Sequence, residues 1–279
     1  MKQYAVVIVI YNPDERINAS VEQLQSDTSV KVIYLVDNSD KSIKYKFDKY
    51  SKAIYIPLNK NMGIGYAQNI GLTKAIEDGY DWALTLDHDT IINDKLLKKY
   101  DEYVSKNKCD RIGIVNSDYY DINSEKMKYG NETPIFIDEV ISSGSLLNLN
   151  VYNQVGKMKE TFFIDQVDNE YCYRLKTNHF KVLILPGKGF EHRLGNIKKK
   201  SIGKKEFYTY NQPPIRTYYR TRNIILFYRM YDDKVLKKKK RKELFLDLCR
   251  IFFENHSIQK FYYFFKGIKD GIKYKSEEV

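Results

Sequence analysis

The sequence of 279 residues has no apolar run of the roughly 20 residues that a membrane-spanning helix needs. Its first apolar run, Ala5–Ile10, has only about the length of the shortest signal-peptide cores. Asn12-Pro13-Asp14 follows it in place of a small-residue cleavage site. We therefore interpret Ala5–Ile10 as a buried first strand and expect no leader peptide.

Cysteine is scarce. The chain has three cysteines, Cys109, Cys172 and Cys249, and they are scattered without metal-ligand spacing. An odd number of separated cysteines excludes a complete disulfide framework and gives no zinc-site signature. This usage fits a reducing compartment, and we predict a cytoplasmic protein.

Acidic residues are rare in one part of the chain. Between Lys198 and Lys242 there are 16 Lys and Arg residues against three acids, a balance of +13, so the remainder of the +11 chain is near −2. This pattern predicts an anion-binding surface in the C-terminal region. It also raises the alternative of a nucleic-acid-binding protein. No recognisable nucleic-acid-binding motif accompanies the charge, so we predict no nucleic-acid partner.

Short β-branched runs alternate with amphipathic stretches in the first part of the chain. Strands are predicted at Ala5–Ile10, Val32–Val36, Ala53–Ile56 and Trp82–Leu86, and helices at Asp14–Leu24 and Gly65–Glu77. Such alternation predicts an α/β fold with a largely parallel sheet and helices on both faces. Ligands bind beyond the carboxyl ends of the strands in such sheets.

The pattern changes toward the C-terminus. We predict a helix at Lys95–Val104, a strand at Ile112–Val115, a hairpin-like stretch at Asp118–Thr133, strand signals within Ile135–Asn148, a helix at Val167–Lys176 and a short strand at Lys181–Leu185. After about Arg193 the sequence becomes rich in Lys, then in Tyr and Arg, then in Phe. We therefore predict a catalytic domain over residues 1–210 and a basic, aromatic helical region over 211–279.

Polar groups follow each of the first four predicted strands, in the stretches Tyr11-Asn12-Pro13, Asp37-Asn38-Ser39, Asn59–Gly63 and Asp87-His88-Asp89. Two carboxylates so close together repel each other unless a cation or hydrogen bonds offset their charge. A divalent ion held by one or two carboxylates and by substrate phosphates is the usual arrangement for Mg²⁺. The alternative is a turn that caps a helix. If the segment is extended, His88 points away from the metal.

The motifs YNP, VDNSD, NKNMGIGYAQNIGL, LDHD, FFIDQVDNEYCYR and EHRLG occur in this order. In this order the chain resembles family 2 glycosyltransferases, and it looks closest to the rhamnosyltransferase-like branch that builds bacterial surface polysaccharides. The resemblance extends from Tyr4 to Asn223. It implies the GT-A nucleotide-diphospho-sugar transferase fold, with a mostly parallel sheet and a C-terminal helical extension. It also implies transfer of a sugar to an acceptor hydroxyl with inversion.

The resemblance assigns roles to individual residues. It implies contacts with the nucleotide donor from Tyr11, Asn12, Asp37, Asn61, Gly63, Asn69, Asp87 and Arg222. It also implies Mn²⁺ or Mg²⁺ as cofactor, with Asp87, Asp89 and His192 as ligands. Loop and helix capping is the alternative role for Asp37 and for residues 59–69. A solvated helix face is the alternative for Arg222, and a structural hydrogen bond is the alternative for His192.

The match to the family's paired acids makes Asp168 the catalytic base. A carboxylate is needed there because an acceptor hydroxyl is a weak nucleophile until its proton is taken during attack. Asp165 is the competing base. Residues two apart at a helix start point in different directions, so Glu170 is expected to orient or cap.

The donor expected from the resemblance is dTDP-rhamnose, with UDP-galactose or UDP-glucose as alternatives, and the acceptor is a glycan or a lipid-linked molecule. A nucleotidyltransferase would carry a Gly-rich, basic loop after the first strand, and Tyr11-Asn12-Pro13-Asp14 is not one. The stretch Arg241–Lys266 predicts an amphipathic helix with aromatic residues and basic flanks. It can lie on the inner face of the membrane, form a homodimer or pack on the main domain.

Overall fold

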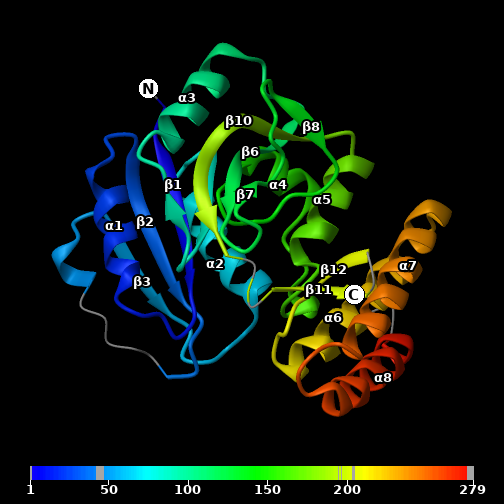
Figure 1. Ribbon diagram of the computed structural model, residues 1–279. Coiled ribbons are helices and arrows are strands. Elements are labelled where there is room, and N and C mark those ends of the chain that lie inside the picture. The colour runs from blue at the N-terminus through cyan, green and yellow to red at the C-terminus, as the bar shows by residue number, and fades with distance from the viewer. Residues whose placement is uncertain (1, 42–46, 194, 196, 203–204, 275–279) are drawn as a thin grey trace. The chain divides into compact units, whose positions relative to one another are not determined.

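The computed structural model describes residues 2–41, 47–193, 195, 197–202 and 205–274. The chain forms two compact units, coloured along the sequence in Figure 1. Unit 1 contains Met1–Glu160 and Asp168–Arg193, and unit 2 contains Thr161–Val167 and Leu194–Val279. The functional division into residues 1–210 and 211–279 remains a prediction.

Unit 1 is built on one mixed sheet with the strand order β3-β2-β1-β4-β9-β6-β10-β5, where β7 pairs with β6 and β8 pairs with β10. The strands are β1 (Tyr4–Ile10), β2 (Val30–Asp37), β3 (Ala53–Pro57), β4 (Trp82–Asp87), β5 (Ile91–Ile92), β6 (Ile112–Asp121), β7 (Lys126–Met127), β8 (Ile135–Ile137), β9 (Ser145–Asn148) and β10 (Lys181–His192). The helices are α1 (Arg16–Ser26), α2 (Ile64–Glu77), α3 (Leu96–Lys106), α4 (Leu149–Val155) and α5 (Val167–Thr177), with a short 3₁₀ turn η1 (Phe47–Lys49). A second 3₁₀ turn, η2 (Glu160–Phe162), begins at the last residue of unit 1 and continues into unit 2.

The predicted mostly parallel sheet is confirmed. β1 pairs in parallel with β2 and β4, β2 with β3, and β6 with β10. β9 is antiparallel to both β4 and β6, so these two neighbours of β9 run in the same direction. One reversed strand therefore joins two parallel groups, and the carboxyl ends of β1, β2, β4, β6 and β10 meet at the same edge.

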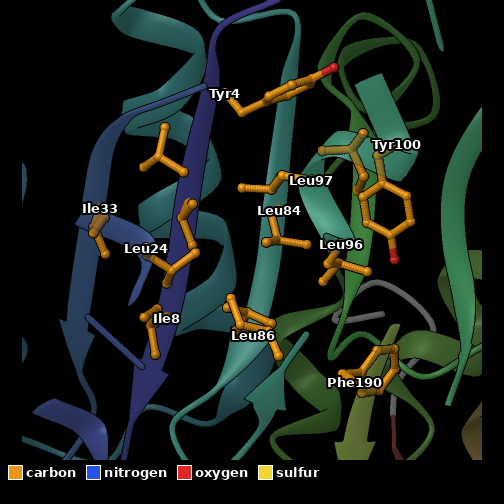
Figure 2. Close-up of a cluster of buried hydrophobic side chains, with 14 of the residues drawn as sticks. Tyr4, Ile8, Leu24, Ile33, Leu84, Leu86, Leu96, Leu97, Tyr100 and Phe190 are labelled. Atoms are coloured by element: carbon orange, nitrogen blue, oxygen red, sulfur yellow. The ribbon is translucent and has the colours of Figure 1, made fainter. Parts of the chain in front are cut away.

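Helices cover both faces of the sheet. On one face, alternate residues of β1 such as Tyr4 and Ile8 pack with Leu24 of α1 and Leu97 of α3, as Figure 2 shows. On the opposite face α2 approaches closely, because a Cβ on Gly71 would lie 2.3 Å from the Val7 side chain. Only glycine allows this contact, so the sequence fixes the distance between α2 and β1.

In the second half of unit 1, one predicted strand ends later than expected and one helix was missed. The strand predicted at Lys181–Leu185 continues to His192, with a register shift between Leu185 and Phe190. The chain passes Pro186 and reaches φ +76° at Gly187, so these residues produce an irregularity within β10 instead of ending it. The short helix α4 was not predicted. It begins at the cap Asn148, whose side chain accepts bonds from the backbone N–H groups of Asn150 and Val151.

Unit 2 contains the hairpin β11 (Lys198–Ile202) and β12 (Lys205–Thr209), and the helices α6 (Pro214–Met230), α7 (Lys234–Ile251) and α8 (Ser257–Lys273). The single helix predicted at Arg241–Lys266 is wrong. Helix α7 ends at Ile251, and His256, at φ +58°, precedes the start of α8. Gly267 and Gly271 of α8 face the backbone of α6, which brings the two helices close together. Among the described residues, no helix is long and apolar enough to cross a membrane.

Candidate active site

The candidate site lies at the edge of the unit 1 sheet where the parallel strands β1, β2, β4, β6 and β10 end, next to the end of β3. Their last residues are Ile10, Asp37, Asp87, Asp121 and His192. The register places Ile10 opposite Asp37, Val9 opposite Asp87 and Asp121 opposite His192. The fold thus brings the polar strand ends predicted from the sequence to one edge.

Asp37 is buried at the end of β2. Its carboxylate accepts a bond from the backbone N–H of Ser39 at 3.0 Å and another from the hydroxyl of Tyr55. Asn12, at φ +43°, donates its N–H to the Ser39 hydroxyl at 2.9 Å, and Tyr11 beside it is exposed. The turns after β1 and β2 therefore brace each other, and the carboxylate keeps acceptor capacity for a ligand hydroxyl.

The loop before α2 is ordered by side-chain amides. Asn38 donates to Asn61 at 3.1 Å and accepts the Met62 N–H at 2.7 Å, while Asn61 accepts the Gly63 N–H at 3.1 Å. Gly63 caps α2 at φ +87°, a conformation that favours glycine. Backbone N–H groups at such a helix start favour anions.

The acidic residues after β4 form a turn, in which the Thr90 N–H donates to the Asp87 carbonyl at 3.2 Å. The expectation that His88 points away from a metal assumed an extended segment. Because the segment is a turn, alternation of side chains along a strand does not apply to it. Ser143 supports the turn, since its hydroxyl accepts the Asp87 N–H at 3.0 Å and lies 2.6 Å from the Thr90 hydroxyl.

His192 is buried at the end of β10, opposite Asp121 of β6. Burial lowers its pKa, whereas the charges of Asp89, Asp121 and Asp168 act in the opposite direction. The net lowering keeps the imidazole neutral at pH 7, the form that binds metals. Its Nδ1 is buried and has no hydrogen-bond partner among the residues that the structure describes. An unpaired buried nitrogen suits an additional ligand, because buried polar atoms are normally paired.

The residues present fit a divalent cation of the Mn²⁺ or Mg²⁺ kind. Carboxylate oxygens from Asp87 and Asp89 are hard ligands, and a neutral imidazole suits manganese. Within the described part of the chain, no three His, Cys, Asp or Glu side chains are already gathered around one point that could hold a metal.

Asp168 lies in the first turn of α5, where the partial positive charge of the helix favours a carboxylate. Its charge contributes to the raised pKa of Tyr119, which burial causes in the main, and it also acts on His192. The charge of Asp168 therefore acts on residues of β6 and β10, the strands that carry Tyr119 and His192.

Glu170 has a structural role. It is fully buried, and Arg174 donates to its two oxygens at 2.8 and 2.9 Å. The same guanidinium donates to the backbone carbonyls of Val155, Gly156 and Lys157. The prediction that Glu170 orients or caps agrees with these contacts, which tie α5 to the end of α4.

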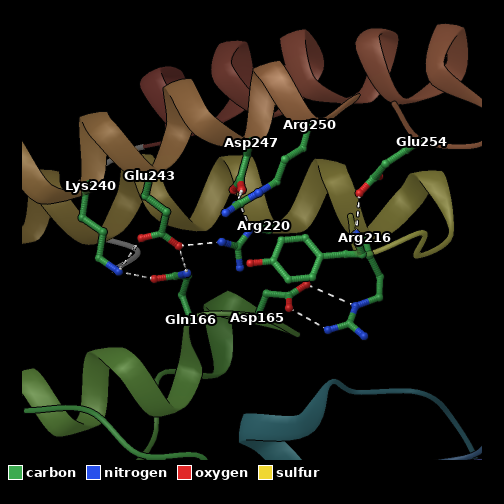
Figure 3. Close-up of polar contacts among 10 residues, drawn as sticks. Asp165, Gln166, Arg216, Arg220, Lys240, Glu243, Asp247, Arg250 and Glu254 are labelled. Atoms are coloured by element: carbon green, nitrogen blue, oxygen red, sulfur yellow. Dashed lines mark hydrogen bonds and ion pairs between the residues drawn. The ribbon is translucent and has the colours of Figure 1, made fainter. Parts of the chain in front are cut away.

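Three other predicted residues have contacts of a different kind. Asp165, the competing base, belongs to unit 2 and is held by Arg216 at 2.6 and 3.2 Å (Figure 3). Arg222 also belongs to unit 2, and it donates to the Thr161 carbonyl at 2.6 Å. Asn69 is buried in unit 1.

The amide of Asn69 is used within the protein. It donates to the Met158 carbonyl and the Glu160 carboxylate, and it accepts from the Tyr152 hydroxyl and the Met158 N–H. These contacts favour a structural role for Asn69 over contact with a donor.

Asp121 and Ser143 were missed as site residues. From the sequence, Asp121 falls within the polar stretch Asp118–Thr133, because β6 carries the polar residues Asn116, Ser117 and Asp118 inside the sheet. Only strand pairing places it opposite His192. Ser143 stands in a Ser-Ser-Gly-Ser sequence that gives no sign of a contact with residue 87.

A mixed sheet with helices on both faces, and with acids and an imidazole at its carboxyl edge, is the arrangement of the GT-A class of nucleotide-sugar transferases. The Glycosyl transferase family 2 model matches residues 5–166. The chain is 33% identical over 242 residues to the dTDP-rhamnosyl transferase RfbF of Shigella flexneri, covering 80% of this chain and 79% of that protein. The chain belongs to glycosyl transferase family 2 and is a glycosyltransferase.

Solved structures share the fold. The crystal structure of S. aureus TarS 1–349 in complex with UDP-GlcNAc matches with a TM-score of 0.61 at 14% identity, covering 97% of this chain and 81% of that one. GalNAc-T7 with UDP, GalNAc and Mn²⁺ matches with a TM-score of 0.60 at 14% identity, covering 84% of this chain and 48% of that one. The chain spans 43% of a longer TarS chain. At these identities the likeness concerns the fold alone.

Proposed function

We propose that the chain is a metal-dependent, inverting transferase that moves rhamnose from dTDP-rhamnose to an acceptor hydroxyl. The observation that carries the proposed mechanism is that the acidic turn Asp87–Asp89 and the buried imidazole of His192 lie at the ends of parallel strands at one edge of the sheet, where the charges of Asp89 and Asp168 act on His192. The relation to the Shigella flexneri dTDP-rhamnosyl transferase supports rhamnose as the sugar. UDP-galactose and UDP-glucose are the alternative donors.

In this proposal the strand ends hold the donor. Asp37 accepts a hydrogen bond from the ribose or the base, and Tyr11 and Asn12 border the same end of the sheet. The loop containing Asn61 and Gly63 presents its backbone to the nucleotide at the start of α2. These contacts orient the sugar so that one face is open to the acceptor.

Asp87, Asp89 and His192 would hold Mn²⁺ or Mg²⁺. When bound, the ion offsets the negative charge that develops on the departing nucleotide diphosphate. The low pKa of His192 keeps its nitrogen available to a metal at neutral pH. Ser143 holds the backbone of Asp87 and so keeps the acidic turn in one conformation.

Asp168 takes the proton of the acceptor hydroxyl while its oxygen attacks the anomeric carbon. The bond from that carbon to the diphosphate oxygen breaks on the opposite side, so the configuration inverts. The proton ends on the Asp168 carboxylate and the electron pair on the diphosphate. Asp165 is not the base in this proposal, because its carboxylate is paired with Arg216.

We further propose that the protein works in the cytoplasm at the inner face of the membrane, on a glycan or lipid-linked acceptor. The support is an exposed stripe on α8 formed by Ile258, Tyr262, Phe265 and Ile272, with exposed lysines beside it. Aromatic and basic helix faces bind anionic bilayers. Sedimentation with phosphatidylglycerol vesicles but not phosphatidylcholine vesicles would support this, and a salt-resistant homodimer instead would contradict it.

A nucleotide-sugar panel with and without Mn²⁺ tests the donor, with release of nucleotide diphosphate as readout. We expect dTDP-rhamnose to be used best and EDTA to abolish release. The variant Asp168→Asn should lower turnover by about 10²- to 10⁴-fold, the usual contribution of a general base, while dTDP binding persists. Asp138→Asn is the matched control, since this acid is exposed and pairs with Lys176. Turnover by Asp168→Asn equal to that of the control would exclude Asp168 as the base.

A further inference from the structure

The segment that precedes the catalytic aspartate has an unusual backbone. Thr161–Val167 groups with unit 2, although the residues before and after it belong to unit 1. Phe163, Asp165 and Gln166 have φ values of +61°, +65° and +67°. Non-glycine residues rarely adopt this conformation, and a strained stretch persists only where its surroundings hold it.

A buried asparagine holds the backbone of this segment. The Nδ2 group of Asn223, on α6, donates to the carbonyls of Phe162, Ile164 and Asp165 at 2.6, 2.8 and 2.9 Å. Asn223 is itself fixed, because its Oδ1 accepts from the Arg222 guanidinium at 2.9 and 3.0 Å. One side chain thus fixes three peptide groups of the strained turn.

Side chains of the segment are held as well, as Figure 3 shows for two of them. Asp165 pairs with Arg216 of α6. Gln166 is buried, accepts from Lys240 of α7 at 2.5 Å and donates to Glu243 at 3.0 Å. The amide oxygen of Gln166 is therefore bound by Lys240 and its amide nitrogen by Glu243, and these two residues also pair with each other at 3.1 Å.

We infer that α6 and α7 are a positioning device for the catalytic base, with Asn223, Arg216 and Lys240 as positioning residues. The held segment ends at Val167, and the next residue of the chain is Asp168. Fixing the backbone up to Gln166 limits the positions that the first turn of α5 can take. A displacement of about 1 Å at a reacting group can cost a hundredfold in rate, so such support affects turnover directly. The inference rests on the proposed role of Asp168.

A purely structural role for these contacts predicts a different result. If α6 and α7 only stabilise unit 2, loss of any comparable contact on α6 should have the same effect. Arg229 offers the matched control, because it also lies on α6 and donates to backbone carbonyls, those of Gly271 and Ile272 in α8. It makes no contact with Thr161–Val167 among the hydrogen bonds of the described residues.

The test compares Asn223→Ser, Arg216→Gln and Arg229→Gln in the full chain. The assay is hydrolysis of dTDP-rhamnose with Mn²⁺, in which water replaces the acceptor, together with calorimetric binding of dTDP and Mn²⁺. We expect kcat to fall about 10- to 100-fold in the first two variants. KM and the dTDP affinity should stay within about twofold, and Arg216→Lys should recover part of kcat.

A kcat in Asn223→Ser and Arg216→Gln no lower than in Arg229→Gln would overturn the inference. Arg216→Gln keeps the test sound if Asn223→Ser does not fold, since Arg216 is partly exposed. Asp168→Asn is measured in parallel. Full activity of that variant refutes the proposed base, whereas its inactivity beside active Asn223 and Arg216 variants refutes only the positioning role.

Discussion

The ion pair between Glu170 and Arg174 tests whether Glu170 stabilises the fold while Asp168, on the same helix, acts in catalysis as proposed. Glu170 is completely buried, and the Arg174 side chain is 13% exposed. Glu170→Ala would remove the carboxylate that pairs with the buried guanidinium of Arg174. Removing one partner of a buried pair typically costs about 3–5 kcal/mol. We expect the lower end, roughly 3 kcal/mol, because Arg174 would keep three backbone carbonyls as acceptors.

For a chain of this size, a loss of roughly 3 kcal/mol corresponds to a fall in Tm of about 6–12 °C. Thermal unfolding followed by circular dichroism measures this directly. The control is Asp138→Ala. It breaks an exposed ion pair with Lys176, which lies on α5 as Glu170 does. Exposed pairs contribute at most about 1 kcal/mol, so the Tm of the control should change by no more than about 4 °C.

The transfer rate of Glu170→Ala, measured well below its Tm, separates stability from catalysis. We expect it to stay within about threefold of the wild type, since the carboxylate of Glu170 faces Arg174 and not the strand ends. Two results would refute the reasoning. One is a Tm equal to that of Asp138→Ala, and the other is a large loss of turnover at unchanged Tm.

Three further predictions concern stability. Burial raises and Arg220 lowers the pKa of Glu243, with a net lowering. The stabilisation from the Glu243 carboxylate is therefore present above its unfolded pKa near 4.5 and is lost as the pH falls through the folded value. Glu243→Gln should weaken the pH dependence of the free energy of unfolding below pH 4.5, measured by urea unfolding at a series of acidic pH values. Gly267→Ala places a Cβ 2.7 Å from the Tyr218 carbonyl and should cost about 1–3 kcal/mol in urea unfolding. Asn69→Ala should cost about 2–4 kcal/mol yet leave dTDP affinity in calorimetry unchanged.

The sequence predicts the first half of the fold well because its signals are local. β1 is a continuous apolar run and β4 is apolar up to Leu86 except for Thr85. Each is followed by a polar turn, so the sequence predicts both the strand and the polar residue after it. Asp37 and Asp87 lie at strand ends as expected. The resemblance supplied the roles, and the alternation of strands and helices supplied the common edge.

The remaining features depend on contacts between distant residues. β10 runs through Pro186 because pairing with β6 and β5 continues on the far side of the irregularity. Asp121 becomes a neighbour of His192 only through that pairing. The pairing of Asp165 with Arg216 could not be predicted for the same reason, since Arg216 lies 51 residues along the chain from Asp165. No sequence pattern near Asp165 predicts that Arg216 pairs with it.

The most direct test of the central claim is calorimetric titration of dTDP into the protein with Mn²⁺ and, separately, with EDTA. We expect binding only with the metal, and a loss of affinity of at least tenfold in Asp89→Asn, since a lost ligand usually costs about 10- to 100-fold or more. Equal dTDP affinity with EDTA and in Asp89→Asn would contradict a metal-held diphosphate at the end of β4.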